Sequence, residues 1–453
     1  MEDRTAALAV AHDHAARFLA GLADRPVWPR ATYPDRLAAL GGPLPDAWQD
    51  PAQVVAELAE RADPGIVAIP GGRFFGFVIG GSLPAAVGAD WLTSAWDQNA
   101  GLSALSPAAA AAESISAGWL LDLFGLPPAS SVGFVTGAMM ANFTCLAAAR
   151  RDVLTRAGWD LDGRGMTGAP RVRVGVGEYR HDTVDRALRY LGFGRDDLVV
   201  VPADSEGRIA AVTLADALAG VSGPLIVCLQ AGEVHTGAFD PFEELVPVAR
   251  EHDAWVHVDG AFGLWAAAAA GTRHLTAGVT AADSWATDAH KTLNVPYDSG
   301  IAILARPETM QAVFGIHADY LIQGTADPLE STPEFSRRAR GFAVWAALRS
   351  LGRSGVDALV SGLCANATRM ADGLRKLGAE VCNDVCFTQV MVRFGDDATT
   401  ERVGAELLAD GTAVLTPGRW YGRSVLRCSV SNWSTTASDV DRTIEAVARL
   451  WRA

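Results

Sequence analysis

Lysine is scarce in this chain, and its scarcity singles out one residue. Of the 38 basic residues only two are lysines, Lys291 and Lys376, and the rest are arginines. A primary amine forms a Schiff base with an aldehyde, whereas a guanidinium group does not. Lys376 lies in LRKLG near a predicted helix end, where any cation would serve. Lys291, in ATDAHKTLNVP after a short apolar strand, is therefore the candidate for covalent carbonyl chemistry.

A carboxylate, Asp259, ends the apolar strand in AWVHVDGAFGLWA. A carboxylate in such surroundings is costly without a cationic partner. A protonated pyridine nitrogen would be such a partner, and Ala261 leaves room for a flat ring beside the strand. Two alternatives remain open here, namely a structural Asp that caps the following turn and an H-x-D metal pair with His257. The metal pair lacks further ligands at a usable spacing.

Two junctions between a strand and a helix carry further candidates. SVGFVTGAMMANF predicts a turn at Gly137 and a helix from about Ala138, whose free N–H groups would suit a phosphate. A plain strand-to-helix turn is the alternative, and the spacing is not that of a nucleotide P-loop. His181, in GEYRHDTVDRALRYLG, could stack on a cofactor ring or simply cap the helix.

Alternating strands and helices predict how these residues come together. Residues 69–335 alternate short β-branched runs with longer helical ones, which favours an α/β domain with a mainly parallel sheet. Ligands of such sheets bind beyond the carboxyl ends of the strands, so Asp259 and Lys291 should meet there. Residues 1–68 predict a helical arm used for subunit contact, and residues 336–453 predict a smaller α+β domain. A chain of 453 residues is long enough for two cores.

Composition excludes several classes of partner. The net charge of -14 gives no overall attraction to nucleic acid or anionic lipid. The N-terminal segment lacks the pattern of a signal peptide, and no later run of 18 uncharged apolar residues occurs, so we expect a cytoplasmic protein without a membrane span. The six cysteines show no paired metal spacing, and we expect no metal.

Taken together, these segments closely resemble the pyridoxal-phosphate-dependent group II amino acid decarboxylases, which have the aspartate-aminotransferase-like fold type I. The similarity runs from RFFGFV at 73–78 to LRCSVSNWSTT at 426–436. It rests on the glycine turn with A-N, the His, the H-V-D-x-A and the H-K, which follow the family's order and spacing. The resemblance implies that Lys291 binds the cofactor as an internal aldimine and that Asp259 pairs with the pyridine nitrogen. It implies that His181 and Ala261 pack on the two faces of the ring. It further implies that the phosphate is held by Gly137, Ala138 and His290, and that Arg427 binds a substrate carboxylate.

The resemblance further implies a lyase that decarboxylates an amino acid and works as a homodimer. Two departures keep alternatives open. Met139 stands where relatives commonly have a hydroxyl residue in the phosphate turn, and residues 321–335 are short and lack the tyrosine that relatives use as an acid. Tyr320 precedes that stretch and is not assigned the role. Transamination, oxidative deamination or aldol-type cleavage on the same scaffold is the alternative, and a non-catalytic descendant is a more remote one. Phe74, Phe75 and Trp96 are candidates to face an aromatic substrate, although such residues are more often core.

Overall fold

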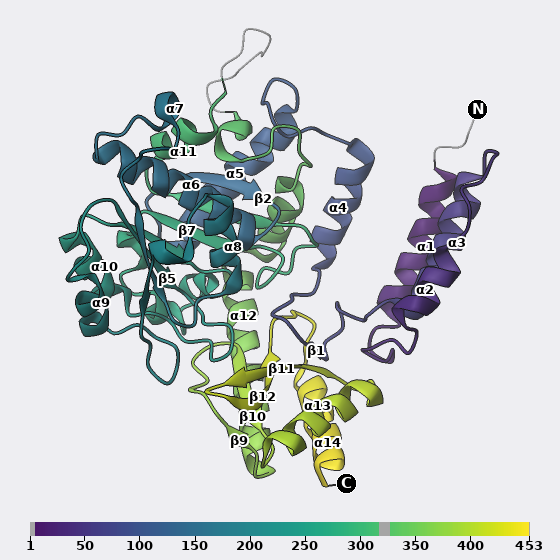
Figure 1. The fold of residues 1–453 in the computed structure, drawn as a ribbon. Helices are drawn as coiled ribbons and strands as arrows, with labels where there is room; N and C mark the ends of the chain where they lie inside the picture. The colour runs from purple at the N-terminus through teal and green to yellow at the C-terminus, as the bar shows by residue number, and fades with distance from the viewer. Residues whose placement is uncertain (1–4, 317–326, 453) are drawn as a thin grey trace.

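The larger sheet of the protein is mainly parallel. The structure, a computed structural model, describes residues 5–316 and 327–452 (Figure 1). Seven strands lie in the order β2-β8-β7-β6-β5-β3-β4, and β8 alone runs antiparallel to its neighbours. These strands are β2 (Ser131–Val135), β3 (Arg173–Gly177), β4 (Leu198–Val201), β5 (Leu225–Gln230), β6 (Trp255–Asp259), β7 (Ser284–Asp288) and β8 (Gly300–Leu304). The prediction of a mainly parallel α/β sheet is confirmed.

Helices cover both faces of this sheet, so the arrangement has three layers. One face packs against α6 (Ala138–Arg156), α8 (Asp182–Tyr190) and α11 (Pro307–Phe314). The other packs against α5 (Pro107–Phe124), α9 (Ala211–Leu218), α10 (Phe242–Glu251) and the first part of α12 (Gly341–Lys376). The remaining helices around the sheet are α4 (Pro84–Trp96), α7 (Leu161–Arg164), η2 (Arg195–Asp197), η3 (Gly263–Ala268), η4 (Arg273–Thr276), η5 (Val279–Ala281) and η6 (Pro328–Ser331).

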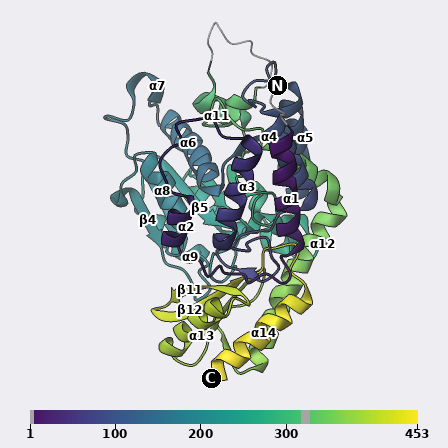
Figure 2. The same cartoon turned by 90° about the vertical axis from the view of Figure 1, so that its right-hand side faces the viewer.

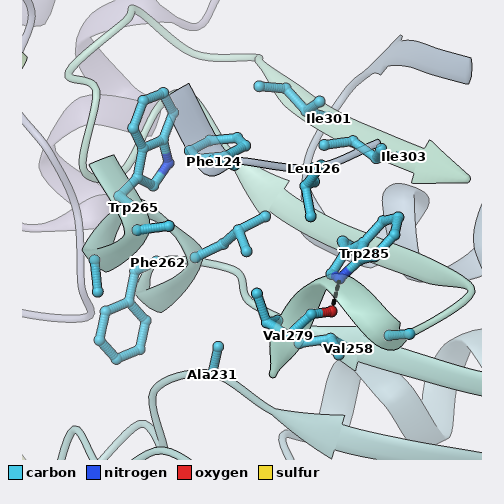
Figure 3. Packing of buried hydrophobic residues seen from close by; sticks show 14 of the residues in the cluster. Phe124, Leu126, Ala231, Val258, Phe262, Trp265, Val279, Trp285, Ile301 and Ile303 are labelled. Atoms are coloured by element: carbon cyan, nitrogen blue, oxygen red, sulfur yellow. Dashed lines mark hydrogen bonds between the residues drawn. The ribbon is translucent and has the colours of Figure 1, made fainter. Parts of the chain in front are cut away.

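The central strands hold their position because both of their faces are buried. Every residue of β5, β6 and β7 is buried, as expected for parallel strands covered by helices on both sides. On the face that α5 and α10 cover, Phe124 meets Trp265 edge to face with ring centroids 5.0 Å apart (Figure 3). Trp285 in the same cluster donates its indole N–H to the carbonyl of Val279 at 2.9 Å. This packing leaves the carboxyl ends of the strands rigidly placed.

A second, smaller sheet gathers segments from both ends of the chain. Its order is β1-β11-β12-β10-β9, with β1 parallel to β11 and the other pairs antiparallel. Its elements are β1 (Phe74–Phe75), β9 (Glu380–Val381), β10 (Gln389–Arg393), β11 (Val414–Trp420) and β12 (Arg423–Ser429), which pack with α13 (Asp397–Asp410), α14 (Ala437–Arg452) and the end of α12. α12 bends at Gly352, whose φ of 62° is left-handed, and so serves both sheets. The predicted range 69–335 for the large domain includes β1, which pairs in the smaller sheet. The domain boundaries stay predictions.

The N-terminal helices form a layer of their own beside α4 (Figures 1 and 2). They are α1 (Ala6–Ala20), α2 (Tyr33–Leu40) and α3 (Pro51–Ala62), followed by η1 (Asp63–Gly65). α1 and α2 both pack on α3. Within these three helices, all of which the structure describes, no residue is buried. Residues 5–68 thus form a helical arm, as predicted, and several of its large apolar side chains are exposed.

Hydropathy along the helices bears on membrane insertion. Within residues 5–316 and 327–452, no helix is both long and apolar enough to span a bilayer.

Candidate active site

The carboxyl ends of the large sheet's strands surround a cavity of about 240 Å³. This volume lies just below the roughly 300 Å³ at which small-molecule pockets usually begin, which suits a compact ligand such as one flat ring. Its lining includes all but one of the site residues that the sequence predicts, namely Gly137, Ala138, His181, Asp259, Ala261, His290 and Lys291. Arg427 is not among them. The prediction that Asp259 and Lys291 meet at the strand ends is therefore confirmed.

Lys291 is held by a carboxylate that sequence reasoning did not single out. Its Nζ lies 3.1 Å from Oδ2 of Asp288, the last residue of β7, whose side chain is only 2% exposed. The carbonyl of Asp288 accepts the indole N–H of the fully buried Trp265, which fixes the end of the strand. The turn is also crowded, because a Cβ at Gly80 would lie 2.1 Å from the Lys291 carbonyl oxygen. A side chain at position 80 would displace the lysine.

The predicted phosphate donors converge on the same carboxylate. α6 begins at Ala138, as predicted, and the N–H of Ala138 donates to Asp288 Oδ1 at 2.6 Å. His290 Nε2 lies 3.4 Å from that oxygen, while its Nδ1 accepts the N–H of Ser299. Burial lowers the pKa of His290, although Asp288 opposes this. The ring is thus neutral near pH 7 with its proton on Nε2, facing the start of the helix.

Asp259, the last residue of β6, is a second buried carboxylate in the cavity lining. Its Oδ1 accepts the N–H of Ala261 at 3.2 Å, so Asp259 also caps the turn that follows β6, which the sequence analysis gave as an alternative role. Burial raises the pKa of Asp259, and the nearby His181 and Lys291 lower it. A carboxylate with these surroundings gains from a cation placed in the cavity. Ala261 presents only a methyl group there, which leaves the space beside the strand open.

His181 combines the two roles that the sequence left open. Its Nδ1 accepts the N–H of Thr183 at 3.2 Å and so caps α8, and its ring also lines the cavity. The side chain is open to the cavity mouth, yet the surrounding protein removes enough water to lower the pKa of His181, while Asp259 raises it. The capping bond holds the ring in place without using Nε2.

Arg427 lies on β12 of the smaller sheet and is not part of the cavity lining. It is 7% exposed, and within the described parts of the chain its guanidinium makes no hydrogen bond or ion pair. Burial lowers the pKa of Arg427, and the buried Glu233 raises it. The charge of Arg427 also acts on His181. A buried cation without a partner is costly, and an anion bound near the cavity would remove that cost.

Some lining residues were missed, and the three aromatic candidates are not part of the lining. Phe77, Gln230 and Phe262 line the cavity, and Met139 lies at its helix end. Phe74 and Phe75 are instead buried in β1, and Trp96 packs edge to face on Phe342. The position of Gln230 at the end of β5 was the available signal, because it matches Asp259 in register.

The sequence also singles out Tyr320 and residues 321–335. Tyr320 and residues 321–326 lie outside the described residues. From 327 onward the chain forms η6 and returns toward the sheet, where Ser331 approaches Ser131 of β2 at 3.2 Å.

The metal alternative for Asp259 fails on the geometry of His257. Its Nδ1 lies 2.9 Å from Ser284 Oγ and its Nε2 lies 2.8 Å from Asn142 Oδ1, so both ring nitrogens are already engaged. The residues instead fit pyridoxal phosphate: an amine for its aldehyde, a buried carboxylate for its ring nitrogen and a helix start for its phosphate. The space between Gly137 and His290 at the start of α6 is narrow, because a Cβ at Gly137 would lie 3.2 Å from His290 Cε1.

Comparisons with known proteins identify relatives of the chain. The family model described as "Pyridoxal-dependent decarboxylase conserved domain" matches residues 38–394. The aromatic-L-amino-acid decarboxylase of Bacillus atrophaeus is 28% identical over 68% of this chain, and the L-2,4-diaminobutyrate decarboxylase of Rhizobium meliloti is 28% identical over 81%. The first alignment spans 64% of the relative's length, less than two thirds, and the second spans 75%.

Solved structures support the fold. The crystal structure of Oryza sativa TDC with PLP and tryptamine matches with a TM-score of 0.93 at 23% identity, covering 100% of this chain and 98% of the other. Mouse CSAD in apo form matches with a TM-score of 0.90 at 20% identity, covering 99% of each chain. The predicted fold type I is thus confirmed. Since the family model matches well over half of its residues, the chain belongs to the pyridoxal-dependent decarboxylase family.

Proposed function

We propose that this protein is a pyridoxal-phosphate-dependent amino acid decarboxylase, a carboxy-lyase whose cofactor is held covalently by Lys291. One observation carries the proposal: Lys291, Asp259 and His181 line a single cavity at the carboxyl ends of parallel strands. The amine, the buried carboxylate and the capped imidazole are each the residue type that pyridoxal phosphate chemistry uses.

The chain's own residues would divide the work as follows. Bound pyridoxal phosphate supplies an aldehyde for amines and a ring that accepts the electron pair of a broken bond at Cα. Lys291 Nζ would bind the aldehyde. Asp288 beside it would orient the amine and neutralise its charge when the amine is protonated. Asp259 keeps a proton on the ring nitrogen, and His181 and Ala261 enclose the two faces of the ring.

Binding of the phosphate and of the substrate is assigned to the two ends of the site. Gly137, Ala138 and His290 would hold the phosphate at the start of α6, where N–H groups are available. Arg427 would bind a carboxylate of the substrate, because its buried guanidinium has no partner among the described residues. Which bond breaks depends on how that carboxylate is turned relative to the ring, so Arg427 contributes to the choice of reaction.

Borohydride trapping tests the cofactor site. The protein is reconstituted with pyridoxal phosphate, reduced, and digested for peptide mapping. We expect the adduct on Lys291 and its loss in Lys291→Arg. Lys376→Arg is the matched control because it removes the only other lysine, and it should keep both the adduct and the visible absorbance. An adduct on Lys376 alone would refute the assignment.

Product analysis tests the reaction. Release of carbon dioxide with the corresponding amine from an amino acid panel is the expected result. An aldehyde or keto acid without that amine would favour transamination or oxidative deamination on the same scaffold. Cofactor binding without turnover of any amino acid would favour a non-catalytic descendant.

We extend the proposal to assembly and location. The arm exposes large apolar side chains on all three helices and the segments between and after them, and a second copy of the chain would cover them in a homodimer. These side chains include Leu8, Leu19, Leu37, Leu40, Trp48 and Leu58. A cytoplasmic location fits the six cysteines, all of which are unpaired.

A further inference from the structure

A line of buried polar groups runs behind Asp259, on the side away from the cavity. The indole N–H of Trp255 donates to Ser284 Oγ at 2.9 Å, and Ser284 Oγ lies 2.9 Å from His257 Nδ1. His257 Nε2 lies 2.8 Å from Asn142 Oδ1. Ser284, His257 and Asn142 have no exposed surface, and none of them belongs to the cavity lining. These groups therefore cannot touch a ligand themselves.

Strand periodicity explains why the line ends at Asp259. Side chains two residues apart on a strand share a face, so Trp255, His257 and Asp259 of β6 project to the same side. Ser284 of β7 pairs in register with His257. The helix that covers this face is α6, which carries Asn142.

The hydrogen bonds of this line have one consistent direction. An indole nitrogen can only donate, so Ser284 Oγ accepts from Trp255. The Asn142 carbonyl oxygen can only accept, so His257 Nε2 donates to it and Nδ1 accepts the Ser284 hydroxyl hydrogen. Burial lowers the pKa of His257 to about 3, so the ring is neutral and carries one proton. With Nδ1 accepting, that proton is on Nε2 and is donated to the Asn142 carbonyl oxygen.

The amide nitrogen of Asn142 is the free end of the line. Nδ2 is buried and meets strict hydrogen-bond geometry with no described group. Asn142 is close enough to Asp259 to contribute to lowering the pKa of that carboxyl against the effect of burial, and Asp259 shares with His257 the face of β6 that α6 covers. The reverse orientation of the amide would place its carbonyl oxygen against a carboxylate and leave His257 Nε2–H facing a donor. Both neighbours therefore select the same orientation.

We propose that Asn142 and His257 are positioning residues for Asp259, which orient its carboxylate and keep it ionised opposite the cofactor's ring nitrogen. His257 fixes the amide of Asn142, and the amide presents its hydrogens to the carboxylate from behind. The proposal rests on the proposed function, in which Asp259 pairs with that nitrogen. Neither residue is assigned any contact with substrate or cofactor.

The test measures the protonation of the ring nitrogen directly in the holoprotein. The protein is loaded with pyridoxal phosphate carrying ¹⁵N in the ring, and the nitrogen chemical shift is followed against pH. In Asn142→Leu and His257→Leu we expect the ring nitrogen to lose its proton at least about one pH unit lower than in the wild type, a tenfold change. His257→Gln, which can still donate to Asn142, should recover most of that difference.

A matched control separates this role from the general effect of removing any buried polar group by substitution. Thr144→Val lies on the same helix and is equally buried, but Thr144 bonds only to the carbonyl of Met140 among the described residues. It should leave the ring nitrogen unchanged. Folded, loaded Asn142→Leu with a wild-type nitrogen titration would overturn the proposal.

A second measurement on the wild type keeps the proposal testable if the variants do not fold. In protein with ¹⁵N-labelled histidine, His257 should be neutral and protonated on Nε2 at pH 7. Protonation on Nδ1 would overturn the proposal, because Asn142 would then turn its oxygen to Asp259. A wild-type ring nitrogen that is unprotonated, or no cofactor on Lys291, would instead refute the proposed function of Asp259 or of the whole site.

Discussion

Lys291 Nζ lies 3.1 Å from Asp288 Oδ2, so the amine of the cavity is paired with a carboxylate three residues earlier in the chain, at the end of β7. Asp288 also accepts the N–H of Ala138 and faces His290 Nε2. The carboxylate thus engages the same groups that the cofactor would use for its aldehyde and its phosphate. Binding of the cofactor must rearrange contacts around Asp288.

This arrangement predicts that Asp288 matters most before the cofactor binds. Asp288→Ala should lower the free energy of unfolding of the cofactor-free protein by about 2 kcal/mol, because it leaves the partly buried amine of Lys291 and the N–H of Ala138 without their acceptor. Asp288→Asn keeps an acceptor for Ala138 and should cost about 1 kcal/mol. Urea unfolding measures both values. Equal losses in the two variants would show that the charge of Asp288 contributes little.

A second prediction concerns stability in acid. The pKa of His257 is lowered to about 3 by burial, against an ordinary value of about 6.5 in the unfolded chain. Between these values the unfolded chain binds a proton that the native protein does not, so native stability is full above pH 6.5 and falls as the pH decreases toward 3. The loss amounts to about 1 kcal/mol for each pH unit. His257→Gln should remove this part of the slope in urea unfolding measured from pH 4 to 7. An identical slope in both proteins would contradict the neutral state of His257.

A third prediction separates Arg427 from cofactor binding. Arg427→Met should leave pyridoxal phosphate binding unchanged and raise the KM of the amino acid substrate at least about tenfold, since one charge-assisted bond is lost. Its free energy of unfolding should rise or stay level, because a buried cation without a partner is removed. A weaker affinity for pyridoxal phosphate with an unchanged KM would place Arg427 outside the substrate site.

A fourth prediction concerns Met139, the residue without a hydroxyl group at the phosphate end. Met139→Ser should tighten pyridoxal phosphate binding about tenfold, because a hydrogen bond to a charged group contributes about 1.5 kcal/mol. Absorbance titration of the cofactor-free protein gives the dissociation constants. Pyridoxal, which lacks the phosphate, is the control and should bind both proteins equally. A gain for pyridoxal as well would mean that the change acts elsewhere.

A fifth prediction tests the arm as the surface between two copies. Leu8 and Leu58 are each 56% exposed, on α1 and α3. The double variant Leu8→Asp, Leu58→Asp should sediment as a monomer where the wild type sediments as a dimer, because two charges would enter the apolar contact. Val212→Asp, at an exposed position of α9, is the control and should not change the sedimentation. A monomeric wild type would refute the homodimer.

The strand ends of the site were predictable because local patterns carry them. Asp259 and Lys291 each follow a short apolar run, and the rule for parallel sheets places such positions at one edge. Asp288 was missed although it lies three residues before Lys291, and its contact with Ala138, 150 residues away, has no local signal in the sequence. Asn142 has the same difficulty, since inside a helix it has no local signal that it faces His257. Hydrogen bonds between residues far apart in the chain are therefore the part of the site that could not be predicted from the sequence.

The short strand β1 shows the same limit in the fold. Two residues, Phe74 and Phe75, have no periodicity to recognise, and their partners are Val414 and Leu415. The sequence therefore offered Phe74 and Phe75 as candidates to face an aromatic substrate, although the smaller sheet buries both side chains. Phe77, two residues later, does line the cavity, and its N–H donates to Thr416 Oγ1 at 2.9 Å.

The pairing of β1 with β11 sets an order of events during synthesis. A ribosome makes Phe74 long before Val414, so the nascent strand β1 waits without its partner while the large sheet emerges. Because Phe77 follows β1 and is anchored to β11, that side of the cavity closes only after the C-terminal strands have been made. Cofactor capture should therefore follow the synthesis of β11, and nascent chains stalled before Val414 should keep no bound colour once free pyridoxal phosphate is removed.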